Sequence, residues 1–309
     1  MRFPARTTRP VGKLVARVVV IGEAMLELVR KGENWQLGYG GDTLNSAIHL
    51  ARAGHDVAYL TAVGSDPLSS DLKSRWAAEG LDISLVLDHP TRSTGLYAIT
   101  NDVAGERSFT YWRETSAARE MFELDAMAAA KARTKCAELL GFSLISLAIL
   151  PDAGRRHLLN LASLVRANGG KVAFDGNYRP RLWTSRDEAV HWRDLAIGVA
   201  DCGLPTFEDE TALSSEADAA SVAAHWQELG CAETVVKLGA AGCRLPDGLV
   251  VAPEEVLAPV DTSGAGDAFN AGYLGARLDG SDPVAAARAG HALAGWTILR
   301  HGAIPPAEA

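Results

Sequence analysis

The chain has 309 residues, of which 48% are hydrophobic and 22% are charged, and its net charge is −8. This balance is typical of a globular protein with one large domain or two small ones. A protein that binds nucleic acid along its phosphate backbone normally carries a basic face, so the acidic charge argues against nucleic acid as a partner. No apolar run approaches the roughly 20 residues of a membrane span, so no membrane association is predicted.

The two ends of the chain are expected to lie outside the main domain. Residues 1–15 are basic but lack the apolar core of a secretory signal, which predicts a flexible leader. The main domain is expected over residues 16–302, with a short tail over residues 303–309. The four cysteines form no CxxC pair and no zinc-like spacing, which indicates reduced thiols in a cytoplasmic protein.

Short apolar runs alternate with helical patterns along the chain. Buried strands are predicted over residues 16–22, 56–63, 139–147, 171–175 and 233–237, and helices over residues 43–53, 67–79, 153–167, 265–278 and 283–299. This alternation predicts an α/β fold with a doubly wound, mostly parallel sheet and helices on both faces.

Two segments interrupt the alternation. Residues 24–35 and 96–112 are strand-like and contain turn signals at Lys31-Gly32 and Ala104-Gly105, but no helix separates them as in a βαβ unit. We therefore expect a small additional β-sheet that covers the site as a lid.

Residues 261–269 (DTSGAGDAF) carry the strongest chemical signal. They join a strand-like stretch, residues 256–260, to the helix that starts at Ala265. Gly264 and Gly266 allow a tight turn, and the free N–H groups at the helix start form an anion site suited to a transferring phosphoryl group. Asp267 is placed beside this site to accept the proton of an attacking hydroxyl. An acid in a first helical turn can also serve the helix dipole alone.

Other nucleotide-binding motifs are missing from the sequence. It contains no GxxxxGK[ST], which argues against a P-loop kinase, and no HRD or DFG pattern of a protein kinase. No GxGxxG follows the first strand, which ends at Gly22, so a dinucleotide dehydrogenase is unsupported.

The stretch DTSGAGDAFNAGYL resembles the C-terminal signature of the ribokinase-like, or PfkB-type, sugar kinases. GGDTLN (residues 40–45), continued through Ala47 and Gly54 to Gly64, resembles their N-terminal signature, and VVKLGAAG (residues 235–242) is similar to their nucleotide-side loop. The resemblance spans about residues 16–302. It implies a Rossmann-like sheet with a β-sheet lid, and transfer of the ATP γ-phosphoryl to a hydroxymethyl group with magnesium on the phosphates. It further implies a catalytic base and an anion hole, formed respectively by Asp267 and by Gly264, Ala265 and Gly266.

The GGD turn is expected beside the sugar. Gly40 and Gly41 allow the backbone to approach a ligand, while Asp42 and Asn45 can bind hydroxyl groups. Asp42 has an alternative role as a helix N-cap, and the two roles are compatible.

Two arginines favour an acidic sugar. Strand alternation places Tyr111 and Arg113 on one face of a lid strand, opposite a partner strand that carries Tyr97. Arg113 then needs an anionic partner, which a ligand carboxylate would provide. Arg179 follows another strand at its C-terminal end, where open α/β sheets bind ligands; a solvated surface charge is the alternative.

The stretches GLYAI (residues 95–99), YWR (residues 111–113) and DGNYRPRLW (residues 175–183) resemble those of 2-keto-3-deoxygluconate kinases, a subgroup of the family. The implied reaction converts 2-dehydro-3-deoxy-D-gluconate and ATP to the 6-phosphate and ADP. The implied sugar-acid contacts are Tyr97, Tyr111, Arg113 and Arg179, and the implied ATP contacts are Asn177, Arg179, Lys237, Gly239, Gly242, Gly264 and Gly266. The alternatives are a neutral-sugar kinase of the fructokinase or ribokinase type and a non-catalytic sugar-acid sensor.

One element departs from the family pattern. An Asn-x-x-Glu motif often lies beside the magnesium–phosphate site, but residues 206–210 read Thr-Phe-Glu-Asp-Glu. Glu208 and Asp209 are thus candidates to lie near Mg²⁺ without binding it directly, and the metal ligands stay open. Lid sheets of this kind can pair between subunits, so a homodimer or a higher homo-oligomer is compatible with the sequence.

Overall fold

The structure is a computed structural model that describes residues 18–101, 107–214 and 216–307. The predicted leader, residues 1–15, and the predicted turn at Ala104-Gly105 lie outside the described residues. Within the described part, no helix combines the length and apolar character needed to cross a membrane.

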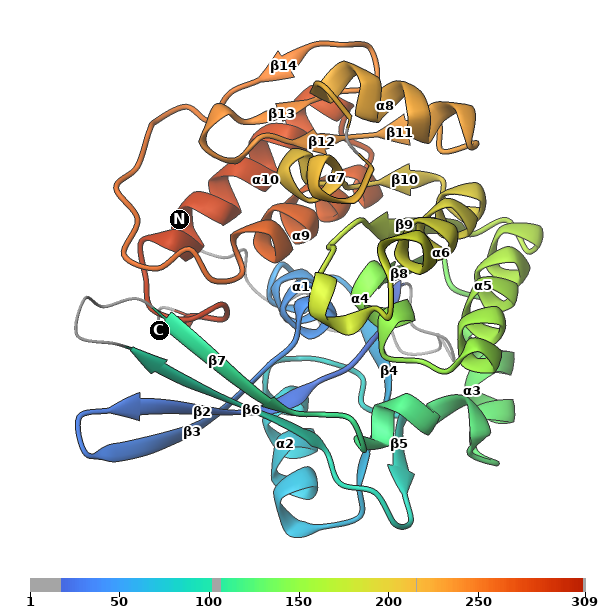
Figure 1. The fold of residues 1–309 in the computed structure, drawn as a ribbon, viewed down its shortest axis with the longest axis vertical. Helices are drawn as coiled ribbons and strands as arrows, with labels where there is room; N and C mark the ends of the chain where they lie inside the picture. The colour runs from blue at the N-terminus through green and yellow to red at the C-terminus, as the bar shows by residue number, and fades with distance from the viewer. Residues whose placement is uncertain (1–17, 102–106, 215, 308–309) are drawn as a thin grey trace.

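The centre of the molecule is a seven-stranded parallel sheet in the order β11-β10-β9-β8-β1-β4-β5 (Figure 1). Its strands are β1 (Val18–Ile21), β4 (Val57–Gly64), β5 (Val86–His89), β8 (Leu139–Ser143), β9 (Lys171–Asp175), β10 (Cys202–Gly203) and β11 (Glu233–Thr234). The central strands are buried on both sides, which explains their continuous apolar runs.

Helices cover both faces of this sheet, as predicted. Val18 and Val20 of β1 pack with α1 (Asp42–Arg52), α2 (Pro67–Ala78), α9 (Ala265–Leu278) and α10 (Pro283–Ile298). Val19 and Ile21 point to the other face and pack with α3 (Met127–Thr134), α4 (Leu144–Ala148), α5 (Asp152–Ala167), α6 (Arg186–Val199), α7 (Phe207–Ser214) and α8 (Ala219–Glu228). Short 3-10 helices span Ala117–Glu123, Pro180–Leu182 and Gly239–Ala241.

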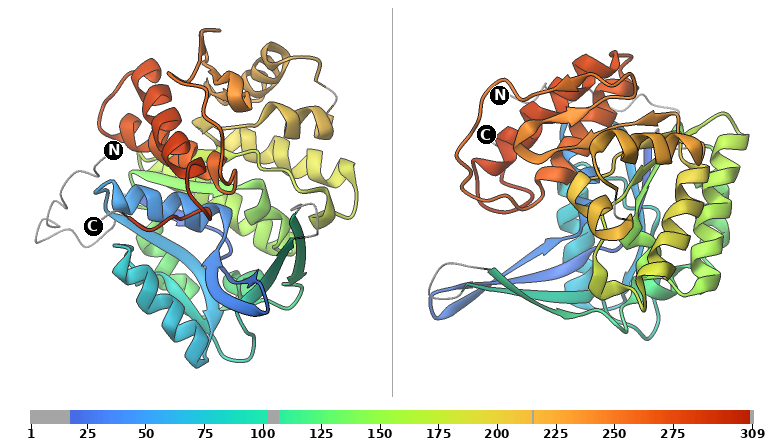
Figure 2. Two further views of the ribbon diagram at one scale, coloured as in Figure 1. Left: turned by 90° about the vertical axis from the view of Figure 1, so that its left-hand side faces the viewer. Right: turned by 45° about the horizontal axis from the view of Figure 1, so that its top comes forward.

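A separate four-stranded sheet, in the order β3-β2-β6-β7, projects from the α/β layers (Figure 2). Its strands are β2 (Met25–Lys31), β3 (Asn34–Gly40), β6 (Gly95–Asn101) and β7 (Arg107–Trp112). This sheet confirms the predicted small additional sheet, and β3 extends further than expected, up to the start of α1. A third sheet contains β12 (Val236–Lys237), β13 (Cys243–Arg244) and β14 (Val250–Val251).

Three predicted strands differ from the structure. The strand predicted over residues 139–147 ends at Ser143, because Ser143 and Ser146 form a capping box that starts α4. The run 233–237 is divided between β11 of the main sheet and β12 of the three-stranded sheet. Residues 256–260 form a loop, and Val256 is 87% exposed. β-branched residues favour a strand only where neighbouring strands can pack against them.

Candidate active site

A cleft of about 2890 Å³ lies between the small sheet, the carboxyl end of the main sheet and the start of α9. This is where open α/β sheets bind ligands. The residues predicted from sequence to act on sugar or ATP all line it: Gly40, Gly41, Asp42, Asn45, Tyr97, Tyr111, Arg113, Asn177, Arg179, Lys237, Gly239, Gly242, Gly264, Ala265, Gly266 and Asp267.

The start of α9 has the geometry of an anion site. Gly264 is its N-cap residue with φ 71°, a left-handed conformation that favours glycine. A Cβ at this position would lie 2.5 Å from Cβ of Ala303, so the close packing also requires glycine. The first-turn amides that follow, those of Gly266 and Asp267, have no intrahelical acceptor and lie at the positive end of the helix.

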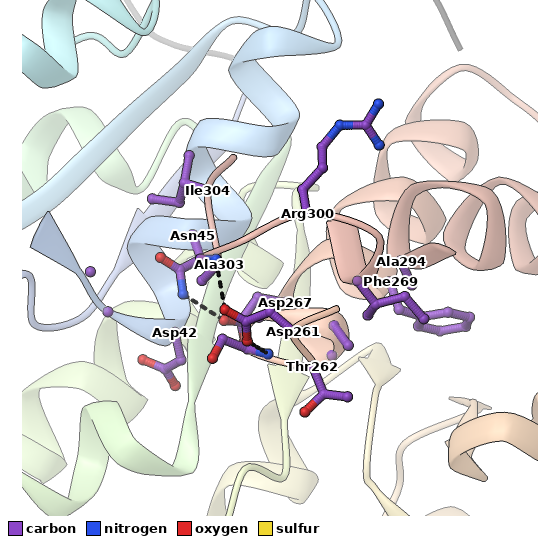
Figure 3. Close-up of a pocket in the computed structure, with 18 of the residues that line it drawn as sticks. Asp42, Asn45, Asp261, Thr262, Asp267, Phe269, Ala294, Arg300, Ala303 and Ile304 are labelled. Carbon is purple, nitrogen blue, oxygen red and sulfur yellow. Dashed lines mark hydrogen bonds between the residues drawn. The ribbon is translucent and has the colours of Figure 1, made fainter. Parts of the chain in front are cut away.

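Asp267 lies half-buried next to this helix start. Nδ2 of Asn45, from α1, donates a hydrogen bond of 2.7 Å to Oδ2 of Asp267 (Figure 3). The pKa of Asp267 is raised to about 8: burial is the largest cause and the nearby Asp42 and Asp175 add to it, while the hydrogen bond from Asn45 and the charge of Lys237 oppose the shift. A carboxylate in this environment is a stronger base than an exposed one.

Asp42 is the second half-buried acid of the site. It is the first residue of α1, and the N-cap is Gly41, so the alternative of Asp42 as the N-cap is wrong. Nδ2 of Asn177 donates to Oδ2 of Asp42 over 3.1 Å. Burial raises the pKa of Asp42, and a hydrogen bond from Ser143 opposes this. Gly41 is needed because a Cβ there would lie 2.3 Å from the carbonyl oxygen of Glu23.

Lys237 belongs to a buried polar network that sequence reasoning did not predict. Its Nζ lies 2.9 Å from Oδ1 of Asp175 and 3.1 Å from Oδ1 of Asn270, whose Nδ2 donates to Oδ2 of Asp175 over 2.9 Å. Two signals could have found these partners: Asp175 ends a strand at the carboxyl edge of the sheet, and Asn270 follows Asp267 by three residues on one helix. The network holds a cation beside Gly266.

The small sheet contributes an aromatic wall. Tyr97 and Tyr111 are directly opposed on β6 and β7, with ring centroids 5.9 Å apart. Tyr97 donates from its hydroxyl to Glu27, and burial raises the pKa of Tyr97 well above its usual range. A Cβ on Gly40 would lie 2.3 Å from this hydroxyl, so glycine makes room for it.

The two arginines of the site already have protein partners. Arg113 forms an ion pair with Glu23, and Nη1 of Arg179 lies 3.3 Å from Oδ1 of Asp209. Glu23 therefore provides an anionic partner for Arg113, and the contact of Arg113 with a substrate carboxylate stays a prediction. The alternative of a solvated surface charge applies in part to Arg179, whose side chain is 52% exposed, whereas the side chain of Arg113 is 8% exposed.

The acidic stretch of α7 lies near the turn that contains Gly239. Asp209 lines the cleft, and burial raises its pKa. Oε1 of Glu208 is 4.0 Å from the position that a Cβ on Gly239 would take. Among the described residues, no group of three or more His, Cys, Asp or Glu side chains is arranged to hold a metal ion. A divalent cation here would need ligands from the substrate phosphates.

Residues 302–305, at the beginning of the predicted tail, pack between α1 and the loop before α9 (Figure 3). Three hydrogen bonds hold them: from Gly302 N to Asp261 Oδ2 (2.8 Å), between His49 Nε2 and Ala303 O (3.0 Å), and from Arg52 Nη1 to Pro305 O (2.6 Å). The segment therefore joins the helix that carries Asp42 and Asn45 to the loop that carries Gly264.

Comparison with known proteins identifies the family of the chain. The model of the pfkB family carbohydrate kinases matches residues 15–309. The 2-dehydro-3-deoxygluconokinase of Escherichia coli (strain K12) is 42% identical over 308 residues, covering 95% of this chain and 98% of that protein. The Dickeya dadantii protein of the same name is 39% identical over 302 residues, covering 94% and 97%. A solved PfkB protein from Polaromonas is 30% identical, with a TM-score of 0.82 and coverage of 94% and 97%. The chain belongs to the pfkB family of carbohydrate kinases.

Proposed function

We propose that the protein is a 2-dehydro-3-deoxygluconokinase, which transfers the γ-phosphoryl group of ATP to the terminal hydroxyl of 2-dehydro-3-deoxy-D-gluconate. The observation that supports the reaction type is the half-buried carboxylate of Asp267, with its raised pKa, beside the amides that start α9. The substrate follows from the relatives named for this sugar acid, which are similar over nearly the whole chain.

In the proposed mechanism, Asp267 accepts the proton of the 6-hydroxyl as its oxygen attacks the γ-phosphorus. The new O–P bond forms while the bond between the γ-phosphorus and the β,γ-bridging oxygen breaks, and ADP leaves with that electron pair. Gly264, Ala265 and Gly266 bring the helix start close enough for its amides to stabilise the charge on the γ-phosphoryl oxygens. The raised pKa of Asp267 makes the proton transfer favourable near neutral or mildly alkaline pH.

The sugar is proposed to lie under the small sheet, which acts as a lid. Asp42 and Asn45 face the cleft from the start of α1 and would bind sugar hydroxyls, close to the backbone of the GGD turn. Tyr97 and Tyr111 would cover the apolar face of the sugar. Arg113 would contact its carboxylate, and Arg179 would lie between sugar acid and phosphates.

ATP is proposed to occupy the opposite side of the cleft. Gly239 and Gly242 have φ of 57° and 102°, and a Cβ on Gly242 would lie 2.1 Å from the carbonyl oxygen of Val251. Glycine is therefore favoured in this turn, and without side chains its backbone would be accessible to the nucleotide. Lys237 and Asn177 would face the phosphates. Mg²⁺ would neutralise phosphate charge, with Asp209 and Glu208 toward its hydration shell.

Cellular location and assembly are also part of the proposal. The four cysteines are free thiols, and ATP is the phosphoryl donor, which together favour the cytoplasm. A homodimer joined through the small sheets is our expectation for the oligomeric state, and size-exclusion chromatography with light scattering tests it.

The direct test is ADP release by the purified protein with ATP, Mg²⁺ and either 2-dehydro-3-deoxy-D-gluconate or a neutral sugar, fructose or ribose. We expect kcat/KM to be highest for the sugar acid. A higher kcat/KM for fructose or ribose would establish a neutral-sugar kinase instead. Tight calorimetric binding of the sugar acid without any ADP release would indicate a sensor.

A further inference from the structure

The four strands of the small sheet join the main domain around one buried residue, Glu23. β2 starts two residues after Glu23, and the pairing register places Gly40, the end of β3, and Gly95, the start of β6, next to Met25. Leu96 is in turn paired with Trp112, the end of β7. In all four strands, the end that joins the main domain therefore lies close to Glu23.

Glu23 makes side-chain contacts with the end of β7. One carboxylate oxygen is paired with Nη2 of Arg113, and the other accepts a hydrogen bond from Oγ of Ser116. The side chain of Glu23 is 1% exposed and that of Arg113 is 8% exposed. Removal of one partner from such a buried pair leaves the other charge uncompensated, so the two side chains hold each other in place.

Arg113 keeps one donor unused. Its Nε is buried, and no acceptor among the described residues lies within hydrogen-bond reach of it. Arg113 lines the cleft, and its guanidinium carbon lies 5.8 Å from the ring centre of Tyr111. A buried donor without an acceptor is uncommon, because losing its hydrogen bond to water is costly. The unused Nε thus indicates an acceptor that arrives with a ligand.

We propose that Glu23 is a positioning residue for substrate recognition. Its ion pair with Nη2 fixes the guanidinium of Arg113 so that the unused Nε–H meets the substrate carboxylate, and it ties this guanidinium to the base of the small sheet. The inference rests on the proposed function, because it takes the sugar acid as the ligand. Recognition of the carboxylate and orientation of the lid are thereby coupled through one ion pair.

A double-mutant cycle tests this role. Glu23→Gln, Arg113→Gln and the double variant are compared with wild type by kcat, by KM for the sugar acid and by KM for ATP. We expect Glu23→Gln to raise KM for the sugar acid by about 10- to 100-fold, the effect of a misplaced binding group, while KM for ATP changes little. In the Arg113→Gln background the same substitution should change KM for the sugar acid by less than about threefold, since contacting residues are not additive.

A matched control is available in Glu233→Gln. Glu233 also holds an arginine and a hydroxyl, those of Arg277 and Tyr273, but at the far end of α9. Its substitution should lower the melting temperature without changing KM for the sugar acid. Independent, additive losses of Glu23 and Arg113 would overturn the inference, as would a lower KM in Glu23→Gln, which would mean that Glu23 competes with the substrate for Arg113.

If Glu23→Gln does not fold, the comparison of the double variant with Arg113→Gln decides, because the double variant leaves no charge unpaired. Equal KM values support the inference, and a further rise in the double variant overturns it. Failure of the proposed function looks different: wild type itself would then release no ADP with the sugar acid.

Discussion

The pH dependence of catalysis follows from the surroundings of Asp267. This carboxylate must be ionised to accept a proton, yet burial beside Asp42 raises its pKa to about 8. A group with that pKa is about 1% ionised at pH 6, about 10% at pH 7 and half ionised at pH 8. Because kcat/KM reports ionisation in the free enzyme, its value for the sugar acid should rise about 50-fold between pH 6 and pH 8 and then level off.

Two neighbours of Asp267 should move this profile in opposite directions. Asp42→Asn removes a negative charge that raises the pKa of Asp267, so the rise in kcat/KM should shift to lower pH. Asn45→Ala removes the hydrogen bond that stabilises the ionised carboxylate, so the rise should shift to higher pH. Either substitution will also weaken sugar binding, but this changes the height of the profile and not its midpoint.

The assay is ADP release at saturating ATP and Mg²⁺, over about pH 5.5 to 9.5 at constant ionic strength, with the sugar acid well below KM. A profile that is flat above pH 6 would refute the raised pKa or the role of Asp267 as the base. Shifts of both variants in the same direction would refute the attribution of that pKa to Asp42 and Asn45.

Four further predictions concern the same site. Asp267→Asn should lower kcat at least about a thousandfold with ATP affinity by calorimetry unchanged, and near-normal turnover would reject the base. The pKa of Asp267 is higher in the folded state than in the unfolded state, so ionisation destabilises folded wild type increasingly as pH rises from about 5 to 8. The melting temperature of Asp267→Asn relative to wild type should therefore increase over this range. Gly264→Ala should lower kcat on the order of a hundredfold, because its Cβ would displace Ala303 and the helix start. Gly280→Ala is the control for backbone strain alone, since Gly280 has φ 88° and no atom near its Cβ position. An equal loss of kcat in Gly280→Ala would contradict the reasoning. Excess EDTA should abolish activity and added Mg²⁺ restore it, and full turnover in EDTA would show that no divalent cation is needed.

Much of the main sheet could be predicted because its strands are short apolar runs buried on both faces. The strand at Lys171–Asp175 and the helix at Ala265–Leu278 have the predicted bounds. The site loop before α9 could be predicted for a related reason: two glycines followed by an acid at a helix start leave few structural alternatives. Local sequence determines these features, so local reasoning finds them.

Features that depend on distant partners could not be predicted in the same way. The run 233–237 reads as one strand, and only its neighbours divide it between two sheets. Glu23 follows Gly22 and looks like any loop acid, because its partner Arg113 is 90 residues away. The sequence around Arg113 therefore gives no sign of Glu23, and it suggests only that a ligand carboxylate would serve as a partner. Proximity between chain segments is set by the tertiary fold, which no single stretch of sequence records.

The packing of residues 302–305 against α1 has a consequence for biosynthesis. A nascent chain that has been translated as far as β11 already contains every strand of the main sheet, so the sheet and its first helices can form on the ribosome. The catalytic loop cannot be completed at that stage, since Gly264 packs against Ala303, almost forty residues further along. A chain stalled late in translation would therefore hold a nearly complete scaffold that cannot yet consume ATP, and catalysis would begin only once this segment has left the exit tunnel.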